Sequence, residues 1–113
     1  MSKIINTEEQ NKYVVVKTEG YFNKDLGELV ISVVEEKVQE NKFHFILDLE
    51  QSKIVNSIGA SILIEVIEIL QDKDGTLSLC HMAPIIEKTF SIMGLTKYCE
   101  TFDDEDAALQ KLA

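Results

Sequence analysis

The segment that runs from Phe43 to Gln71 constrains the fold of this chain more than any other. It starts with FHFILDL, which is apolar at nearly every position and is therefore typical of a strand covered on both faces. A short polar loop follows, and a long apolar helix then begins after Asn56 and is stopped by Asp74 and Gly75. A buried strand joined in this way to a long helix predicts a sheet with parallel strands and crossover helices.

Strands alternate with helices over the rest of the chain too. We expect strands at Tyr13–Thr18 and Thr76–His81, and a short strand near Tyr98–Phe102. The segment Lys3–Asn6 can add an antiparallel strand beside the first of these. The sequence therefore predicts the α/β class, with a mixed sheet of four to five strands packed with about four helices in one domain over residues 1–113.

A first helix is predicted to begin at Asp25, with Glu28 three residues later in the arrangement of a capping box. Its apolar residues recur at helical spacing and form one stripe, which comprises Leu26, Leu29, Val30, Val33, Val34 and Val38.

Two further helices are predicted near the C-terminus. Pro84 suits the first turn of a helix over Ile85–Met93, and Gly94 suits its C-terminal cap. The acidic run Asp103–Asp106 then precedes a last helix that ends at Lys111, so that both ends match the helix dipole. The same acidic run lacks the ligand spacing and the central glycine of a calcium loop, which favours helix capping over calcium binding.

The charge and the cysteines limit the partners and the compartment. A formal net charge of −9 argues against nucleic acid or an anionic membrane surface as the partner and favours a protein with a basic or neutral face. The sequence predicts no signal peptide and no membrane span. Cys80 and Cys99 form neither a disulfide framework nor a CxxC pair, so we expect a reduced, cytoplasmic protein.

The histidines and the motifs of this sequence do not indicate an active site. His44 and His81 are each expected within a strand, and two such histidines without cysteines at ligand spacing predict no metal site. The sequence has no glycine-rich nucleotide motif, phosphate-binding loop or nucleophile elbow. We therefore expect no catalytic residue, no cofactor and no enzyme activity.

The helix after Asn56 is apolar around most of its circumference. Its polar residues fall on one narrow stripe, which comprises Ser57, Ser61, Glu65, Glu68 and Asp72. Such a helix is either sunk between neighbouring elements or has an apolar face for a protein partner, and the two can coexist. Gly59 in the first turn is explained either by the close approach of another backbone or by tight packing on the strand before the helix.

Ser57 is expected at the N-terminus of that helix. Backbone N–H groups are unpaired there and the helix dipole is positive, so a phosphate on Ser57 would be electrostatically favourable. The pattern therefore favours a switchable contact surface rather than an active site.

Several motifs follow one another in a fixed order. Asp48 and Leu49 end a strand, Asn56–Gly59 reads as [DN]-S-x-G at the start of an apolar helix, and Gly94 and Leu95 end a later helix. The acidic run then leads to Ala107, Ala108 and Leu109. Together they resemble the STAS domain over nearly the whole chain, in the form of the free-standing anti-sigma factor antagonist.

The resemblance implies a partner switch. Ser57 would be phosphorylated by an anti-sigma factor serine kinase and restored by a phosphatase, and the unmodified form would bind the kinase and free the sigma factor. The partner-binding surface would comprise Asn56, Ser57, Ile58, Gly59, Ser61 and Ile62.

Asn56 departs from the family pattern, which usually has an aspartate before the serine. An amide can cap a helix, but it cannot act as a general base or help to hold a cation. Two alternatives therefore stay open. Ser57 is either the controlled residue of a phosphorylation switch, or it only caps the helix of a domain that binds unregulated, such as a STAS subunit of a membrane transport or other signalling assembly.

Overall fold

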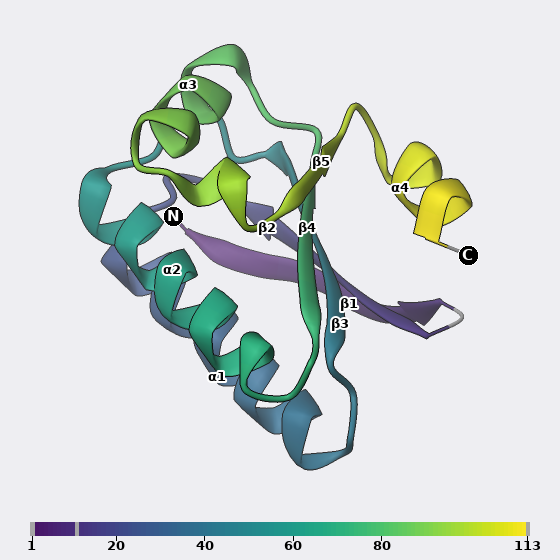
Figure 1. Cartoon of the computed structure of the whole chain (residues 1–113). Coiled ribbons are helices and arrows are strands. Elements are labelled where there is room, and N and C mark those ends of the chain that lie inside the picture. Colours follow the sequence, from purple (N-terminus) through teal and green to yellow (C-terminus); the bar gives the residue numbers. More distant parts are fainter. Residues whose placement is uncertain (1, 11, 113) are drawn as a thin grey trace.

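The computed structural model describes residues 2–10 and 12–112, which form a mixed sheet of five strands (Figure 1). The strands are β1 (Lys3–Gln10), β2 (Tyr13–Glu19), β3 (His44–Gln51), β4 (Thr76–Cys80) and β5 (Glu100–Phe102). They lie side by side in chain order. β1 is antiparallel to β2, and all the other neighbours are parallel. This arrangement confirms the predicted fold class.

Four α-helices and a short 3-10 helix connect the described strands and follow them. They are α1 (Lys24–Gln39), α2 (Ser57–Gln71), α3 (Pro84–Ile92), η1 (Leu95–Lys97) and α4 (Glu105–Leu112). α1 and α2 pack against each other along one side of the sheet, whereas α4 lies apart from them near the C-terminus (Figure 1). The parallel pairs β2–β3 and β3–β4 are joined through α1 and α2, as expected for crossover connections.

Two hydrophobic clusters occupy the two faces of the sheet. The larger one joins the sheet to α1, α2 and α3, and it includes Phe45 and Leu47 from β3. The smaller one includes Ile46 from β3 and Ala108 from α4. Because successive side chains of a strand point to opposite faces, β3 contributes to both clusters. Burial of β3 on both faces confirms what its continuous apolar character predicted.

The start of α1 differs from the prediction. Asn23 is the N-cap, and its Oδ1 accepts a hydrogen bond from the Leu26 N–H at 3.1 Å. The predicted capping box of Asp25 and Glu28 is therefore wrong, because Asp25 already lies inside the first turn. Leu29 is 43% exposed, although it was expected in the apolar stripe. It lies to the side of the helix face that packs on the sheet.

The C-terminal part follows the predicted helix ends. Gly94 follows α3 in the left-handed conformation with φ of 83°, and the Asp104 Oδ1 caps α4 by accepting from the Ala107 N–H at 2.7 Å. β4, however, ends at Cys80, and His81 leaves the strand with φ of 58°. The prediction that His81 lies within a strand is therefore wrong, because the chain turns there toward α3.

Candidate functional site

The loop before α2 is paired with the loop before α1. Val55 forms a parallel bridge with Phe22. The Phe22 N–H donates to the carbonyl of Ile54 at 2.7 Å, and the Phe22 carbonyl accepts from the Asn56 N–H at 3.2 Å. These bonds extend the pairing of β2 and β3 beyond the ends of both strands. The backbone from which α2 starts is therefore fixed on one side by the neighbouring loop.

Nearer to the strand ends, the same two loops are also joined by side-chain and backbone hydrogen bonds. The hydroxyl oxygens of Thr18 and Ser52 lie 2.8 Å apart, and both residues are buried. The Gly20 N–H donates to the carbonyl of Gln51 at 3.0 Å. A buried hydroxyl costs free energy unless it is hydrogen-bonded, so this pair stabilises the loop in one conformation.

Asn56 is the N-cap of α2. Its backbone is extended, and its Oδ1 accepts from the Gly59 N–H at 2.7 Å. Ser57 is the first residue of the helix and is exposed. The first turn of α2 contains no acidic residue, so no side chain of that turn offsets the positive end of the helix dipole. An anion on Ser57 would therefore lie in a favourable field.

Three large apolar side chains around this helix start are exposed: Ile54 at 61%, Ile58 at 55% and Tyr21 at 43%. We call these three residues the apolar rim. Ile54 and Tyr21 belong to the two paired loops, next to the bridged residues Val55 and Phe22, and Phe22 is fully buried. Exposed apolar side chains that gather at one place are typical of protein contact sites. The sequence pattern indicated Ile58 but not Ile54 or Tyr21, because loop residues have no periodicity to show which side they face.

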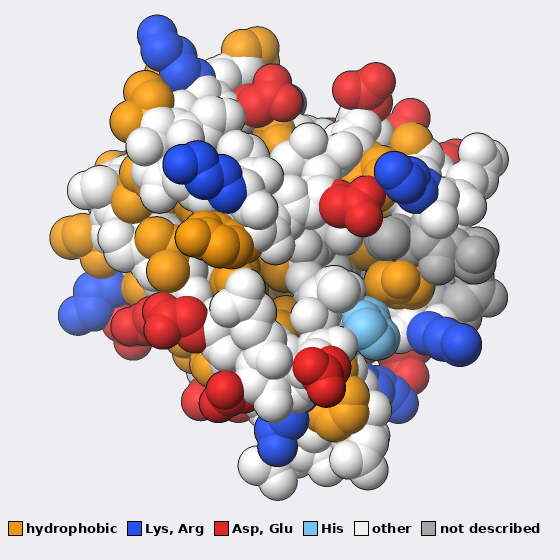
Figure 2. All heavy atoms as spheres, viewed as in Figure 1, with side chains coloured by type: hydrophobic (Ala, Val, Ile, Leu, Met, Phe, Trp, Pro, Cys, Tyr) orange, Lys and Arg blue, Asp and Glu red, His pale blue; other side chains and the backbone are white. Residues whose placement is uncertain are grey.

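A groove of about 380 Å³ runs between α1 and α2 and begins at the apolar rim. Its lining residues are Lys24, Glu28, Ile31, Ile58, Ser61, Ile62 and Glu65. Two of the predicted contact residues therefore face this groove beside Ile58: Ser61 is exposed and Ile62 is half-buried. Figure 2 shows that hydrophobic side chains also gather over the side of the molecule where α2 and α3 lie.

Gly59 is the one predicted contact residue that is buried. A Cβ atom at this position would lie 2.3 Å from the carbonyl oxygen of Phe22. The backbone that approaches Gly59 is therefore the chain's own loop before α1. A backbone does approach Gly59 closely, but it belongs to the same domain, and the packing partner is not the strand before α2. The expectation of Gly59 on the outer contact surface is therefore corrected.

The rest of α2 is largely part of the core. The predicted polar stripe is exposed at every position, from Ser57 to Asp72. The buried residues of α2 are Gly59, Ala60, Leu63, Val66, Ile67 and Leu70. The two interpretations of this helix, a buried helix and a helix with an outer apolar face, therefore apply to different parts of it. Most of its apolar surface is sunk between neighbours, and its first turn presents an apolar outer face.

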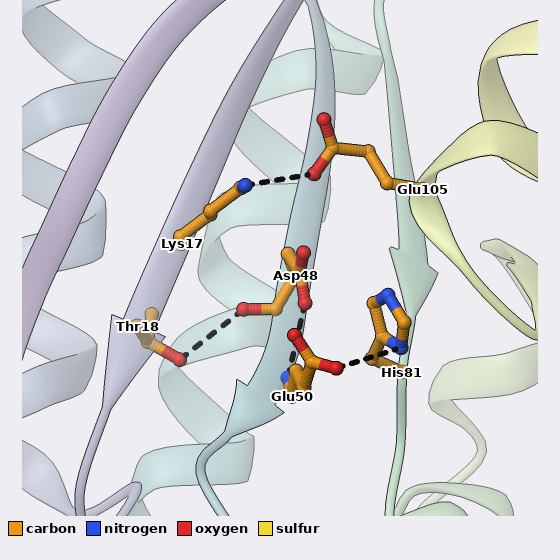
Figure 3. Close-up of polar contacts among 6 residues, drawn as sticks. All are labelled: Lys17, Thr18, Asp48, Glu50, His81 and Glu105. Carbon is orange, nitrogen blue, oxygen red and sulfur yellow. Dashed lines mark hydrogen bonds and ion pairs between the residues drawn. The ribbon is translucent and has the colours of Figure 1, made fainter.

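A second group of polar side chains lies at the carboxyl ends of β2, β3 and β4 (Figure 3). Asp48 is only 4% exposed, and its Oδ1 accepts from the Glu50 N–H at 3.0 Å. The Glu50 Oε2 lies 3.9 Å from the His81 Nδ1, and the Lys17 Nζ lies 3.4 Å from the Glu105 Oε2. The sequence reasoning missed this group because its members are far apart in the chain. A polar Asp48 at the end of an apolar strand was the available signal.

The group is dominated by carboxylates. Burial raises the pKa of the Glu105 carboxyl, Lys17 opposes that shift, and a hydrogen bond to Asp48 adds to it. Burial alone would lower the pKa of Lys17, but the attraction of Glu105 raises it overall. Lys17 therefore stays charged and links α4 to the sheet.

A known domain family has the same order of strands and helices. The family model described as the STAS domain matches residues 5–108, which is nearly the whole chain. The chain belongs to the STAS domain family. In its STAS domain, the serine that follows β3 opens α2, and the acidic run caps α4.

Known STAS proteins are similar in sequence and in structure. The anti-sigma F factor antagonist of Paenibacillus polymyxa is 22% identical over 113 residues, which cover 99% of this chain and 97% of that protein. The crystal structure of an anti-sigma factor antagonist from Mycobacterium paratuberculosis has a TM-score of 0.83 at 19% identity and covers 98% and 93% of the two chains. The structure of the Bacillus cell fate determinant SpoIIAA in its phosphorylated form has a TM-score of 0.75 at 17% identity, covering 96% and 98%.

Within the described part of the chain, every helix is too short or too polar to span a membrane.

Proposed function

We propose that this STAS protein is an anti-sigma factor antagonist that acts by partner switching. Its partner would be an anti-sigma factor serine kinase, which binds the first turn of α2, the apolar rim and the adjacent groove. Phosphorylation of Ser57 by that kinase would release the complex, and a phosphatase would restore binding. The relatives named as anti-sigma factor antagonists support the class of partner.

The observation that carries the proposal is the exposure of Ser57 next to the apolar rim. A kinase can reach the hydroxyl, because Ser57 is exposed at the first position of α2. Ile54 and Ile58 are each more than half exposed, and a partner that covers them would exclude water around the serine. A phosphate adds a charge of about −1.5 to −2 at neutral pH. Covering that charge with an apolar surface costs free energy, so phosphorylation should weaken binding.

The fold should tolerate the phosphate for two reasons. The positive end of the α2 dipole favours an anion at Ser57, and the structure of SpoIIAA in its phosphorylated form supports the same behaviour in a STAS domain. The cap would also stay in place, because Asn56 accepts its hydrogen bond from Gly59 and not from the serine. Phosphorylation would thus act on the contact surface and leave the domain folded.

Asn56 bears on which protein supplies the catalytic groups. Its Oδ1 is engaged by the Gly59 N–H, and an amide does not accept a proton at neutral pH. Any general base for phosphoryl transfer to Ser57 would therefore come from the kinase.

The test is the intact mass of the chain after incubation with its cognate anti-sigma factor kinase and ATP. We expect a gain of one phosphate for the wild type and none for Ser57→Ala. Ser91→Ala is the matched control, since Ser91 is an exposed serine on α3, outside the proposed surface. It should gain the phosphate as the wild type does.

The remaining outcomes distinguish the alternative function. If the wild type binds the kinase but gains no phosphate, Asn56 has disabled the switch and the domain binds its partner unregulated, as a STAS subunit that is never phosphorylated would. The lack of an acidic residue beside Ser57 is the observation that favours this second candidate. If the chain neither binds the kinase nor gains phosphate, the proposed function is wrong.

A further inference from the structure

We propose that Asp48, Glu50 and His81 form a binding site for a divalent transition-metal ion, for which Zn²⁺ is the test ion. The site lies at the carboxyl ends of β3 and β4, on residues that the proposed contact surface does not use (Figure 3). One ligand atom from each of the three residues can be chosen so that all lie within 4.8 Å of one another.

The topology of the sheet brings these residues together. β3 and β4 are parallel neighbours, and Asp48 lies opposite Cys80 in their register. His81 directly follows Cys80, and Glu50 follows Asp48 by two residues, so both carboxylates project from the same face of β3. Figure 3 shows the carboxylate of Glu50 directed toward the imidazole of His81. No local motif in the sequence could indicate this convergence.

The distances are close to those of a coordination sphere. Zinc ligands lie about 2.0–2.1 Å from the ion, so two ligands of a tetrahedral ion are separated by about 3.4 Å. The Glu50 Oε2 and the His81 Nδ1 are 3.9 Å apart. Glu50 is exposed and His81 is half-buried, so rotation of these two side chains can close the remaining distance without moving the strands.

The charges around the site favour a cation. Asp48 and Glu50 belong to the site, and Glu105 faces Asp48 from α4. The ammonium of Lys17 lies near Asp48 and is paired with Glu105. Carboxyl groups therefore outnumber the ammonium around the site, which favours a bound cation.

The donor set and the surroundings indicate which ion. One imidazole nitrogen with carboxylate oxygens suits zinc and its first-row neighbours better than magnesium or calcium, which prefer oxygen ligands only. A hollow of about 160 Å³ borders Asp48 and Glu50 on the side of Lys17 and Thr18. Glu50 is also exposed, so water can reach the carboxylate that faces His81 and can complete the coordination sphere.

The experiment is calorimetric titration of the untagged, full-length chain with zinc chloride. We expect one equivalent of Zn²⁺ to bind the wild type and binding to weaken at least about tenfold in His81→Asn and in Glu50→Gln. Asparagine is chosen because His81 has φ of 58°, a conformation that asparagine tolerates better than alanine. Zn²⁺ should also raise the melting temperature of the wild type but not of either variant.

His44→Asn is the matched control, because His44 is the only other histidine and lies at the opposite end of β3, beside Thr76. It should bind Zn²⁺ as the wild type does. The proposal is overturned if the wild type does not bind, if His81→Asn binds equally well, or if His44→Asn loses binding instead. Circular dichroism without metal should show that all variants are folded.

Discussion

Asn56 and Ser57 have separate tasks at the start of α2. The side-chain oxygen of Asn56 accepts a hydrogen bond from the Gly59 N–H within the first turn. Ser57, the first residue of the helix, is exposed to solvent. A modification of the serine therefore need not disturb the cap. This separation would allow Ser57 to be modified on a helix that belongs mostly to the core.

The contribution of the cap can be measured by substitution of Asn56. Asn56→Ala should lower the free energy of unfolding by about 1 kcal/mol, because the Gly59 N–H loses its partner. Asn56→Asp keeps an oxygen acceptor and adds a negative charge at the positive end of α2, so it should be as stable as the wild type or gain about 0.3–1 kcal/mol. Urea denaturation measures both. Equal stability of the alanine variant and the wild type would show that this hydrogen bond contributes nothing.

The two cysteines should be unreactive in the folded protein. Burial raises the pKa of the Cys99 thiol to about 12 and also raises that of Cys80. Because the thiolate is the reactive form, little of either side chain can react at pH 8. Labelling with iodoacetamide, followed by intact mass, should be slow in buffer and rapid in guanidinium chloride. Rapid labelling of both thiols under native conditions would contradict the buried positions of these residues.

At the scale of elements, the contact between α2 and the loop before α1 determines where the candidate surface lies. The loop passes so close to the helix that Gly59 faces the carbonyl oxygen of Phe22. The same contact leaves Tyr21 and Ile54 on the outside. The apolar rim is therefore a product of how two loops pair and not of either helix alone.

Gly59→Ala tests this contact. The added Cβ would lie 2.3 Å from a backbone oxygen that cannot rotate away, so the free energy of unfolding should fall by about 3 kcal/mol. Gly27→Ala in α1 is the control. There the Cβ would meet only side-chain atoms of Ile62, the Cδ1 at 2.9 Å and the Cβ at 3.0 Å, and alanine favours the helix, so the free energy of unfolding should fall by less than in Gly59→Ala. Equal losses in the two variants would contradict the distinction.

The sequence predicted the elements better than the site. The periodicity of α2 and the apolar character of β3 depend on local spacing, and both were correctly predicted. The spacing of Asp25 and Glu28 predicts a capping box, whereas the structure has Asn23 as the N-cap of α1. Which loop residues are exposed, and that Asp48 and His81 lie close together, depend on the pairing of segments far apart in the sequence. Local residue spacing gives no information on that pairing.

At the scale of the whole molecule, stability and partner binding should be separable. Ser57→Asp adds a charge at an exposed helix N-terminus, so the melting temperature should change little. Binding to the kinase should weaken at least about tenfold, because that charge would be covered by an apolar partner surface. Ser91→Asp is the control and should leave binding unchanged. A large fall in melting temperature for Ser57→Asp would mean that Ser57 has a structural role.

The two faces of the sheet are unequally protected. The larger cluster lies under α1, α2 and α3, whereas α4 covers a smaller one, with buried Val15, Ile46 and Cys80 from three adjacent strands. Proteolytic removal of α4 would leave the helix that carries Ser57 in place but uncover these strands. A chain without α4 should therefore expose an apolar sheet face and aggregate, although the candidate contact surface would still be in place.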